Sequence, residues 1–251
     1  MSKNRPFVLS IAGFDPSGGA GILADCKTFE QHEVYGLAIN TANTIQTENN
    51  FYEIEWTSLE FTTRSIEKLF NTYKIKAVKI GIVPSLFYLG TIVTLIKQLS
   101  PATQIVWDTV VKSSTTFDFL EIKNYESLRL ILSEIDLITP NYNEIIKLSK
   151  EETDPESIAE TLSEHCTILL KGGHNPSEPG VDYLYTKEHF FRLEPHHSEI
   201  YEKHGSGCVL SSAITANLSK EQDVLNACKN AKIYIENYLL SNHTKLGYHY
   251  V

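Results

Sequence analysis

Short apolar runs alternate with amphipathic stretches along most of this chain, and this alternation constrains the fold more than any other feature. Runs such as Phe7 to Ala12 and Ala77 to Ile82 have the length and apolar character of buried strands. Stretches between them, such as Leu86 to Leu99, carry apolar residues at helical spacing. Strands that alternate with helices predict an α/β fold, a mainly parallel sheet with helices on both faces.

The same signals place the remaining elements. Further strands are expected at Leu37 to Ile45, Gln104 to Trp107, Leu137 to Thr139 and Ile168 to Lys171. Further helices are expected at Ile22 to His32, Thr63 to Tyr73, Tyr125 to Ser133, Asn143 to Ser149, Pro155 to Glu164, Gly207 to Leu218 and Asp223 to Leu240. Asp182 to Tyr185 and His189 to Leu193 flank a short polar turn and predict a hairpin. No repeat or linker interrupts residues 1–251, so we expect a single domain.

Composition excludes several classes of partner. The formal net charge of -9 argues against nucleic acid or an anionic membrane as the main partner. The longest apolar stretch, Leu86 to Ile96, is too short to span a bilayer, and the first residues do not resemble a signal peptide. The 4 cysteines lack paired metal-ligand spacing and are expected to be reduced thiols of a cytoplasmic protein.

The segment His204-Gly205-Ser206-Gly207-Cys208 precedes a small, apolar run and carries the strongest functional signal. Two glycines allow a tight turn, and a helix that starts there aims free N–H groups and its positive dipole end at one point. An anion can bind at such a point, and the same field favours the thiolate of Cys208. The alternative is an ordinary turn followed by a buried cysteine.

A second glycine-rich segment, Asp15 to Gly21, follows the first strand and precedes a helix. Its glycines do not fit a dinucleotide fingerprint, and it lacks the Lys-Ser/Thr ending of a P-loop. It is either a turn that permits tight helix packing or a loop whose backbone approaches a small ligand. Asp25, one turn into the helix, is either a polar anchor for that ligand or a solvated helix charge.

Several polar residues follow the other predicted strands, where ligands bind in open α/β sheets. Gln46 can present an amide to a heterocycle, although an isolated glutamine at a strand end is more often merely exposed. Asp108 and Glu144 supply hard oxygen ligands suited to Mg²⁺, while Asn141 and Glu144 also fit a helix capping box. Lys171 can reach a nucleotide phosphate or simply be a strand-end charge. Lys112 is a further cation without an assigned purpose.

Together these segments resemble the hydroxymethylpyrimidine/phosphomethylpyrimidine kinases of thiamine biosynthesis, in the ribokinase superfamily and near the pyridoxal kinases. The resemblance covers nearly the whole chain, and its most specific pieces are Ile11 to Gly21, Asn141 to Glu144, Lys171 to His174 and His204 to Cys208. It implies a ribokinase-like three-layer sandwich without a separate lid domain. It also implies phosphorylation of the pyrimidine alcohol and then of its monophosphate, with ATP and Mg²⁺, by a homodimer.

The resemblance assigns roles at matching positions. Gly13, Ala20, Asp25 and Gln46 would line the pyrimidine pocket, with Ile82 in its wall. Asp108 and Glu144 would organise Mg²⁺ and phosphates, and Lys171, Asn141 and Gly173 would bind the nucleotide. Backbone N–H groups of Gly205, Ser206 and Gly207 would hold the transferred phosphoryl group, and Cys208 would accept the proton of the substrate hydroxyl.

This chain departs from the family pattern at four positions. Phe14 replaces a common serine, Ser206 a threonine, Thr109 a proline, and Ile82 a methionine of the pocket wall. Three other functions stay open from the sequence: a pyridoxal kinase, a non-catalytic pyrimidine sensor, and a nicotinamide-dependent oxidoreductase. The glycine spacing argues against the last of these.

Overall fold

A computed structural model describes residues 4–110, 119–175, 177–197 and 199–250 of the chain. Within these residues one sheet holds nine strands in the order β3-β2-β1-β4-β5-β6-β7-β8-β9. The strands are β1 (Phe7–Phe14), β2 (Tyr35–Gln46), β3 (Phe51–Trp56), β4 (Ile75–Ile80), β5 (Gln104–Trp107), β6 (Leu137–Ile138), β7 (Thr167–Leu170), β8 (Asp182–Tyr185) and β9 (Phe190–Leu193). Pairs from β2 through β7 are parallel, and the outer pairs β2–β3, β7–β8 and β8–β9 are antiparallel.

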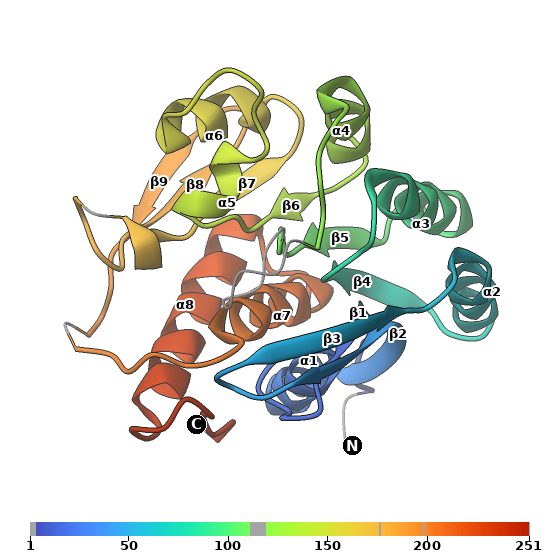
Figure 1. The fold of residues 1–251 in the computed structure, drawn as a ribbon, viewed down its shortest axis with the longest axis horizontal. Helices are drawn as coiled ribbons and strands as arrows, with labels where there is room; N and C mark the ends of the chain where they lie inside the picture. Colours follow the sequence, from blue (N-terminus) through green and yellow to red (C-terminus); the bar gives the residue numbers. More distant parts are fainter. Residues whose placement is uncertain (1–3, 111–118, 176, 198, 251) are drawn as a thin grey trace.

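Helices cover both faces of this sheet, as the alternating pattern predicts. They are α1 (Gly21–Gln31), α2 (Leu59–Phe70), α3 (Leu86–Leu99), α4 (Tyr125–Leu132), α5 (Tyr142–Ile146), α6 (Pro155–Ser163), α7 (Ser206–Ser219) and α8 (Val224–Leu240), with a short 3₁₀ turn η1 (Gly172–His174). Figure 1 shows α2, α3 and α4 on one side of the curved sheet and α1, α7 and α8 on the other. The arrangement is the α/β three-layer sandwich that the resemblance implies.

Alternation along each strand builds two separate cores. In β5, Ile105 and Trp107 pack into the core that includes α3 and α4, whereas Val106 packs into the core with α7 and α8. Successive side chains of a strand point to opposite faces, so a continuous apolar run is what a strand buried on both faces requires.

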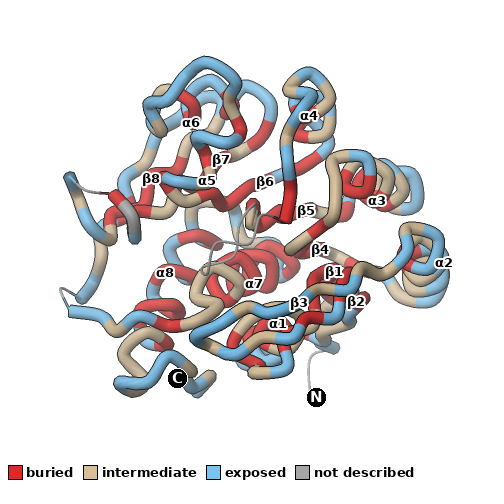
Figure 2. The backbone as a smooth tube through the Cα atoms, in the orientation of Figure 1, coloured by how far each residue is buried: buried red, intermediate tan, exposed pale blue. Residues whose placement is uncertain are grey.

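Helix α7 lies in the centre of the molecule. All its residues from Val209 to Ser219 are buried, and Figure 2 shows it almost entirely in the colour of buried residues. It packs on α1 and α8 and against β4 and β5. Small residues such as Ala213 and Ser212 allow this close approach, and the packing fixes where the N-terminus of α7 points.

The largest differences between the structure and the sequence-based expectation concern β3 and the start of α2, and α5 also ends at Ile146 rather than Ser149. Strand β3 was not predicted, because its side chains are partly or fully exposed and it only borders the edge of the sheet. Helix α2 begins at Leu59 rather than Thr63, because the Ser58 side chain accepts a hydrogen bond from the Phe61 N–H and caps it there.

The cysteines and the lengths of the helices agree with the expectations from the sequence. The four cysteines are free thiols. No helix within the described ranges is long and apolar enough to cross a membrane. Lys112 lies outside the described residues.

Candidate active site

The N-terminus of α7 presents a row of backbone donors. Gly205 precedes the helix in the left-handed conformation, with φ of 74°, which glycine adopts without strain. Among the described residues, no acceptor is recorded for the backbone N–H groups of Gly205, Ser206 and Gly207. Free donors at the positive end of a 14-residue helix are suited to an anion, as the sequence predicts.

Charged side chains that follow three strands, β5, β6 and β7, lie beside this row. Lys171 Nζ is 3.3 Å from Asp108 Oδ1 and 3.6 Å from Glu144 Oε2. A methyl group built on Gly207 would lie 3.3 Å from Lys171 Nζ and within 3.9 Å of both Asp108 oxygens. The structure therefore brings together Gly207, Lys171, Asp108 and Glu144, which the sequence spreads over 100 residues.

Burial and pairing set the charges in this cluster. Desolvation favours the neutral form of Asp108, yet the ammonium groups of Lys171 and Lys79 outweigh it and lower the pKa of that carboxyl. Burial opposes the charge of Lys171, and the carboxylates of Glu144 and Asp108 nonetheless raise its pKa. Glu144 differs, because burial raises its pKa more than Lys171 lowers it. Asp108 and Lys171 thus form a charged pair.

The capping interpretation of Asn141 and Glu144 is confirmed. The Asn141 side chain accepts from the backbone N–H groups of Asn143 and Glu144, and Glu144 Oε2 accepts from the Asn141 N–H at 2.8 Å. One Glu144 oxygen is thereby engaged in the capping box of α5, and the same carboxylate faces Lys171. Capping and a place beside Lys171 are therefore compatible for Glu144.

The two carboxylates fit a Mg²⁺ ion. No group of three or more His, Cys, Asp or Glu side chains within the described ranges could hold a metal without other ligands. Asp108 Oδ2, however, is buried and has no hydrogen-bond partner among the described residues. Mg²⁺ commonly takes one or two carboxylates and completes its shell with phosphate oxygens and water. Asp108, with Glu144 nearby, can therefore hold a magnesium–nucleotide complex.

Cys208 lies in this cluster but is not a ready thiolate. Burial raises the pKa of its thiol to about 12; Lys79 lowers the pKa, while Asp108 and Asp25 raise it. Desolvation therefore opposes the thiolate that the sequence predicts at this helix start. Its position beside Asp108 and Lys79 agrees with the predicted role near the reacting atoms.

Asp25 is neither a solvated helix charge nor an exposed pocket wall. Its side chain is 0% exposed, and Lys79 Nζ, also 0% exposed, donates to both of its oxygens. The hydroxyls of Ser10 and Ser212 donate to the same carboxylate at 2.5 and 2.6 Å. The sequence reasoning missed Lys79, although a lysine inside the apolar strand Ala77 to Ile82 signals a buried partner of opposite charge.

The remaining predicted substrate residues meet at the ends of β1, β2 and β4. A methyl group on Gly13 would lie 2.5 Å from Ile82 Cδ1, so the two positions are in direct contact. Gln46 Nε2 donates to Thr44 Oγ1, which in turn donates to the Phe14 carbonyl oxygen. These contacts form one edge of the site from segments that are adjacent in the sheet.

Ala20 is the N-cap residue of α1 and lies in the glycine-rich loop, where its N–H donates to Asp15 Oδ2 at 2.9 Å.

Gly173 lies in η1, after β7. A methyl group on Gly173 would meet nothing within 4 Å. The space beside Gly173 is therefore open, and its role in nucleotide binding stays a prediction.

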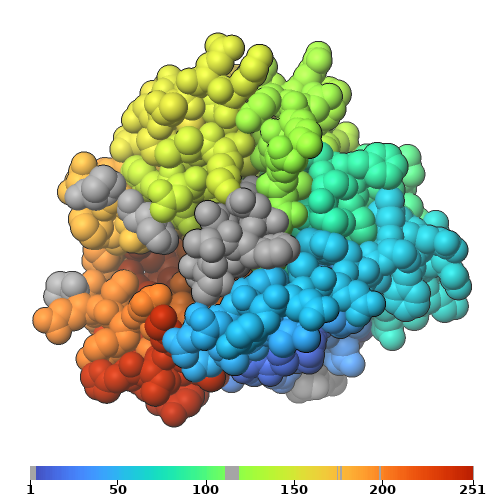
Figure 3. Space-filling view, viewed as in Figure 1, coloured from blue at the N-terminus to red at the C-terminus, as the bar shows by residue number. Residues whose placement is uncertain are grey.

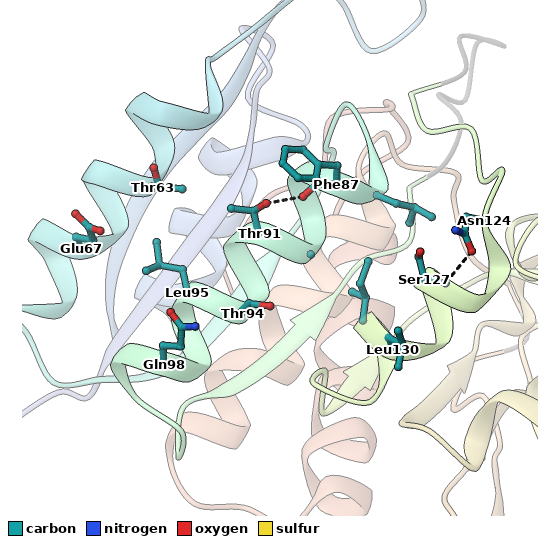
Figure 4. Close-up of a pocket in the computed structure, with 13 residues that line it drawn as sticks. Thr63, Glu67, Phe87, Thr91, Thr94, Leu95, Gln98, Asn124, Ser127 and Leu130 are labelled. Atoms are coloured by element: carbon teal, nitrogen blue, oxygen red, sulfur yellow. Dashed lines mark hydrogen bonds between the residues drawn. The ribbon is translucent and has the colours of Figure 1, made fainter.

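Two surface grooves lie away from this cluster. Figure 4 shows a groove of about 830 Å³ that α2, α3 and α4 line with residues such as Thr63, Phe87 and Leu130. A second groove of about 780 Å³ lies between β2 and α2. None of the described residues that line either groove is a predicted site residue, so the candidate site is defined by its converging donors and charges.

A ribokinase-like sandwich with an anion-binding helix terminus, a lysine and two carboxylates at the strand ends is typical of a small-molecule kinase. Comparison with known proteins identifies the family: the pattern of the phosphomethylpyrimidine kinase family matches residues 15–251, and the chain belongs to it.

Individual relatives agree with this family assignment. The hydroxymethylpyrimidine/phosphomethylpyrimidine kinase of Aquifex aeolicus is 33% identical over 246 residues, which cover 95% of this chain and 96% of the relative. A crystal structure of phosphomethylpyrimidine kinase from Clostridium difficile 630 has a TM-score of 0.76 at 32% identity and covers 92% of this chain and 98% of its own. A Bacillus subtilis pyridoxal kinase in complex with ADP has a TM-score of 0.79 at 27% identity, covering 93% and 91%.

Proposed function

We propose that this protein uses ATP to phosphorylate 4-amino-5-hydroxymethyl-2-methylpyrimidine and then phosphorylates the monophosphate to the diphosphate, in thiamine biosynthesis. The observation that carries the proposal is the convergence of the α7 N-terminus with Lys171 and Asp108. A methyl group built on Gly207 would lie 3.3 Å from Lys171 Nζ. Family membership over residues 15–251 supports the choice of substrate.

The chain's own groups suit phosphoryl transfer. The transition state is loose, so fixed positive charge and correct placement contribute more than covalent chemistry. The N–H groups of Ser206 and Gly207 would hold the oxygens of the transferred group, and the Lys171 ammonium would neutralise charge on the nucleotide. When bound at Asp108 and Glu144, Mg²⁺ would neutralise phosphate charge.

Cys208 is the group proposed to receive the proton of the substrate hydroxyl. Its raised pKa of about 12 makes the thiolate scarce at neutral pH and strongly basic once formed. A thiol that carries its own proton cannot accept another, so only the thiolate form of Cys208 would take up the hydroxyl proton. It would do so late in the step, once the hydroxyl oxygen has bonded to phosphorus and become acidic.

The pyrimidine would lie at the ends of β1, β2 and β4. Gly13, Ile82, Ala20 and Gln46 remain the proposed lining, since they occupy this edge of the sheet. Asp25 would act by holding Lys79 in place rather than by contacting the pyrimidine, because its carboxylate is fully buried.

Two further proposals concern the assembly. We infer that residues 1–251 form one domain, since one sheet and its two cores use elements from β1 to α8.

We also infer a homodimer from the family resemblance, and exposed apolar side chains such as Phe87 (77%) and Leu130 (70%) are available for contact. Light scattering should give twice the mass of the chain; a monomer at micromolar concentration would contradict the dimer.

Steady-state assays of the purified protein with ATP and Mg²⁺ test the function. We expect turnover of both the alcohol and its monophosphate, and an Asp108→Asn variant should lose at least about 10²-fold because it removes the charge that faces Lys171. Absence of turnover on both pyrimidines would refute the proposal.

A pyridoxal kinase is the second candidate, favoured by the likeness to the Bacillus subtilis enzyme at a TM-score of 0.79. Parallel assays separate the two: we expect a higher kcat/KM for the pyrimidine, and a higher value for pyridoxal would reverse the assignment. A pyrimidine sensor would bind ligand in calorimetry without binding nucleotide.

A further inference from the structure

Two glycine-rich segments that are distant in the sequence are in backbone contact. A methyl group on Gly205 would lie 2.0 Å from the Gly19 carbonyl oxygen and 2.8 Å from the Ala20 Cα. The loop that precedes α7 therefore rests directly on the loop that precedes α1. Any shift of one loop must displace the other.

A side-chain pair connects the same two loops. His204 Nε2 lies 2.9 Å from Asp15 Oδ2, with side-chain exposures of 11% and 1%. Asp15 also accepts from the backbone N–H groups of Ser17 and Ala20 and from the Ser17 hydroxyl. The carboxylate thus organises its own loop and reaches across to the residue next to Gly205.

The C-terminal segment holds His204 from the other side. The His204 backbone N–H donates to the Lys245 carbonyl oxygen at 2.9 Å, and Lys203 Nζ donates to the Asn242 carbonyl oxygen at 2.6 Å. A methyl group on Gly19 would meet both His204 and Leu246 within 2.9 Å. Figure 3 shows the C-terminal residues against the surface of the N-terminal part of the chain.

We propose that His204 is a positioning residue: through Asp15 and the C-terminal segment, it fixes residues 205–207 so that their N–H groups point at the transferred phosphoryl group. The inference deepens the proposed function and rests on it. Displacing catalytic donors by about 1 Å can lower a rate by about 10²-fold, so a contact outside the reacting atoms can govern the rate.

Three variants test the proposal. His204→Ala should lower kcat by about 10- to 100-fold while the KM for the pyrimidine stays within about threefold. His204→Gln should recover most of the loss, since its amide can donate to Asp15. The matched control is His196→Ala, which removes another histidine–carboxylate contact, 3.4 Å from Glu236, and should leave kcat unchanged.

A double-mutant cycle tests whether the two residues act together. The Asp15→Ala, His204→Ala double variant should lose no more than about threefold beyond the more impaired single variant, as expected for one shared contact. Independent, multiplicative losses would overturn the proposal. So would a wild-type kcat in His204→Ala, or an equal loss in His196→Ala.

Hydrogen exchange provides a readout that does not depend on turnover. The Val209 amide, which donates to the Gly205 carbonyl oxygen at 3.0 Å, should exchange at least about tenfold faster in His204→Ala than in the wild type, while amides in the α8 core keep their protection. Unchanged exchange of the Val209 amide would refute the positioning role even in an active enzyme. Faster exchange in a protein without pyrimidine kinase activity would refute the proposed function alone.

Discussion

Lys79 Nζ lies 3.0 Å from each carboxylate oxygen of Asp25, and both side chains are fully buried between β4 and α1. Ser10 and Ser212 complete the carboxylate's hydrogen bonds from β1 and α7. Together these four side chains connect β4, α1, β1 and α7, and the Asp25 carboxylate raises the pKa of Lys79 although burial opposes its charge. A buried pair of this kind is costly to break, because removing one partner leaves an uncompensated charge.

Lys79→Met should therefore lower the free energy of unfolding by about 3–5 kcal/mol. Adding Asp25→Asn should restore part of that loss, because the double variant buries no unpaired charge. Urea denaturation measures both values. Lys76→Met is the matched control: its pair with Glu221 is exposed, at 40% and 81%, and should contribute less than about 1 kcal/mol. Equal losses for the two lysines would contradict the interpretation.

Gly205→Ala should abolish most activity. The side chain would sit at a φ of 74° and 2.0 Å from the Gly19 carbonyl oxygen, so both the turn and the contact between the loops must change. We expect a loss in kcat/KM of more than about 10²-fold and a destabilisation of about 1–3 kcal/mol.

Gly90→Ala in α3 controls for the effect of an added methyl group. Its nearest neighbour would be the flexible end of Ile131 at 3.2 Å, and alanine favours a helix by about 0.5–1 kcal/mol. Activity should match the wild type, measured by coupled ATP consumption. A Gly205→Ala enzyme as active as Gly90→Ala would show that the loop tolerates displacement.

The rate should rise with pH if Cys208 is the base. A thiol with a pKa of about 12 gains thiolate roughly tenfold per pH unit below that value, so log kcat should increase between pH 6.5 and 9.5. Cys208→Ala should lower kcat by about 10²-fold and flatten the profile. The same pH slope in the variant would assign the ionisation to another group.

Asp15 should add stability at neutral pH that is lost in acid. Burial favours its neutral form, but hydrogen bonds from His204 and Ser17 outweigh burial and lower the pKa of the carboxyl. A lowered folded-state pKa stabilises the protein above the unfolded value, near 4, and this part is lost as pH falls through the folded value. The gap in unfolding free energy between wild type and Asp15→Asn should therefore shrink from pH 6 to pH 3 in urea titrations. A difference in unfolding free energy that stays constant from pH 6 to pH 3 would contradict this contribution of Asp15.

Local patterns predicted most elements well. The bounds expected for Gln104–Trp107, Leu86–Leu99 and Asp182–Tyr185 agree with the structure, because each segment's burial follows its own apolar spacing. Strand β3 escaped prediction because pairing with β2, rather than its own side chains, makes it a strand. The single domain and the homodimer stay predictions.

The site was predicted in part. Residues at strand ends were chosen correctly as neighbours, since parallel strands bring their carboxyl ends to one edge. The partners were not predictable, because Asp25 and Lys79 are 54 positions apart and Asp15 and His204 are 189 apart. No local spacing encodes such pairs.

The sequence by itself determined the alternation of strands and helices, the family, and the set of chemical groups at the strand ends. These follow from backbone periodicity and from short motifs, which act over a few residues. The tertiary structure alone decided which charges meet, that Asp25 is enclosed, and that burial raises the pKa of the Cys208 thiol. The physical reason is that burial and pairing depend on what packing brings together, and the free energy of a charge depends on those surroundings more than on its place in the chain.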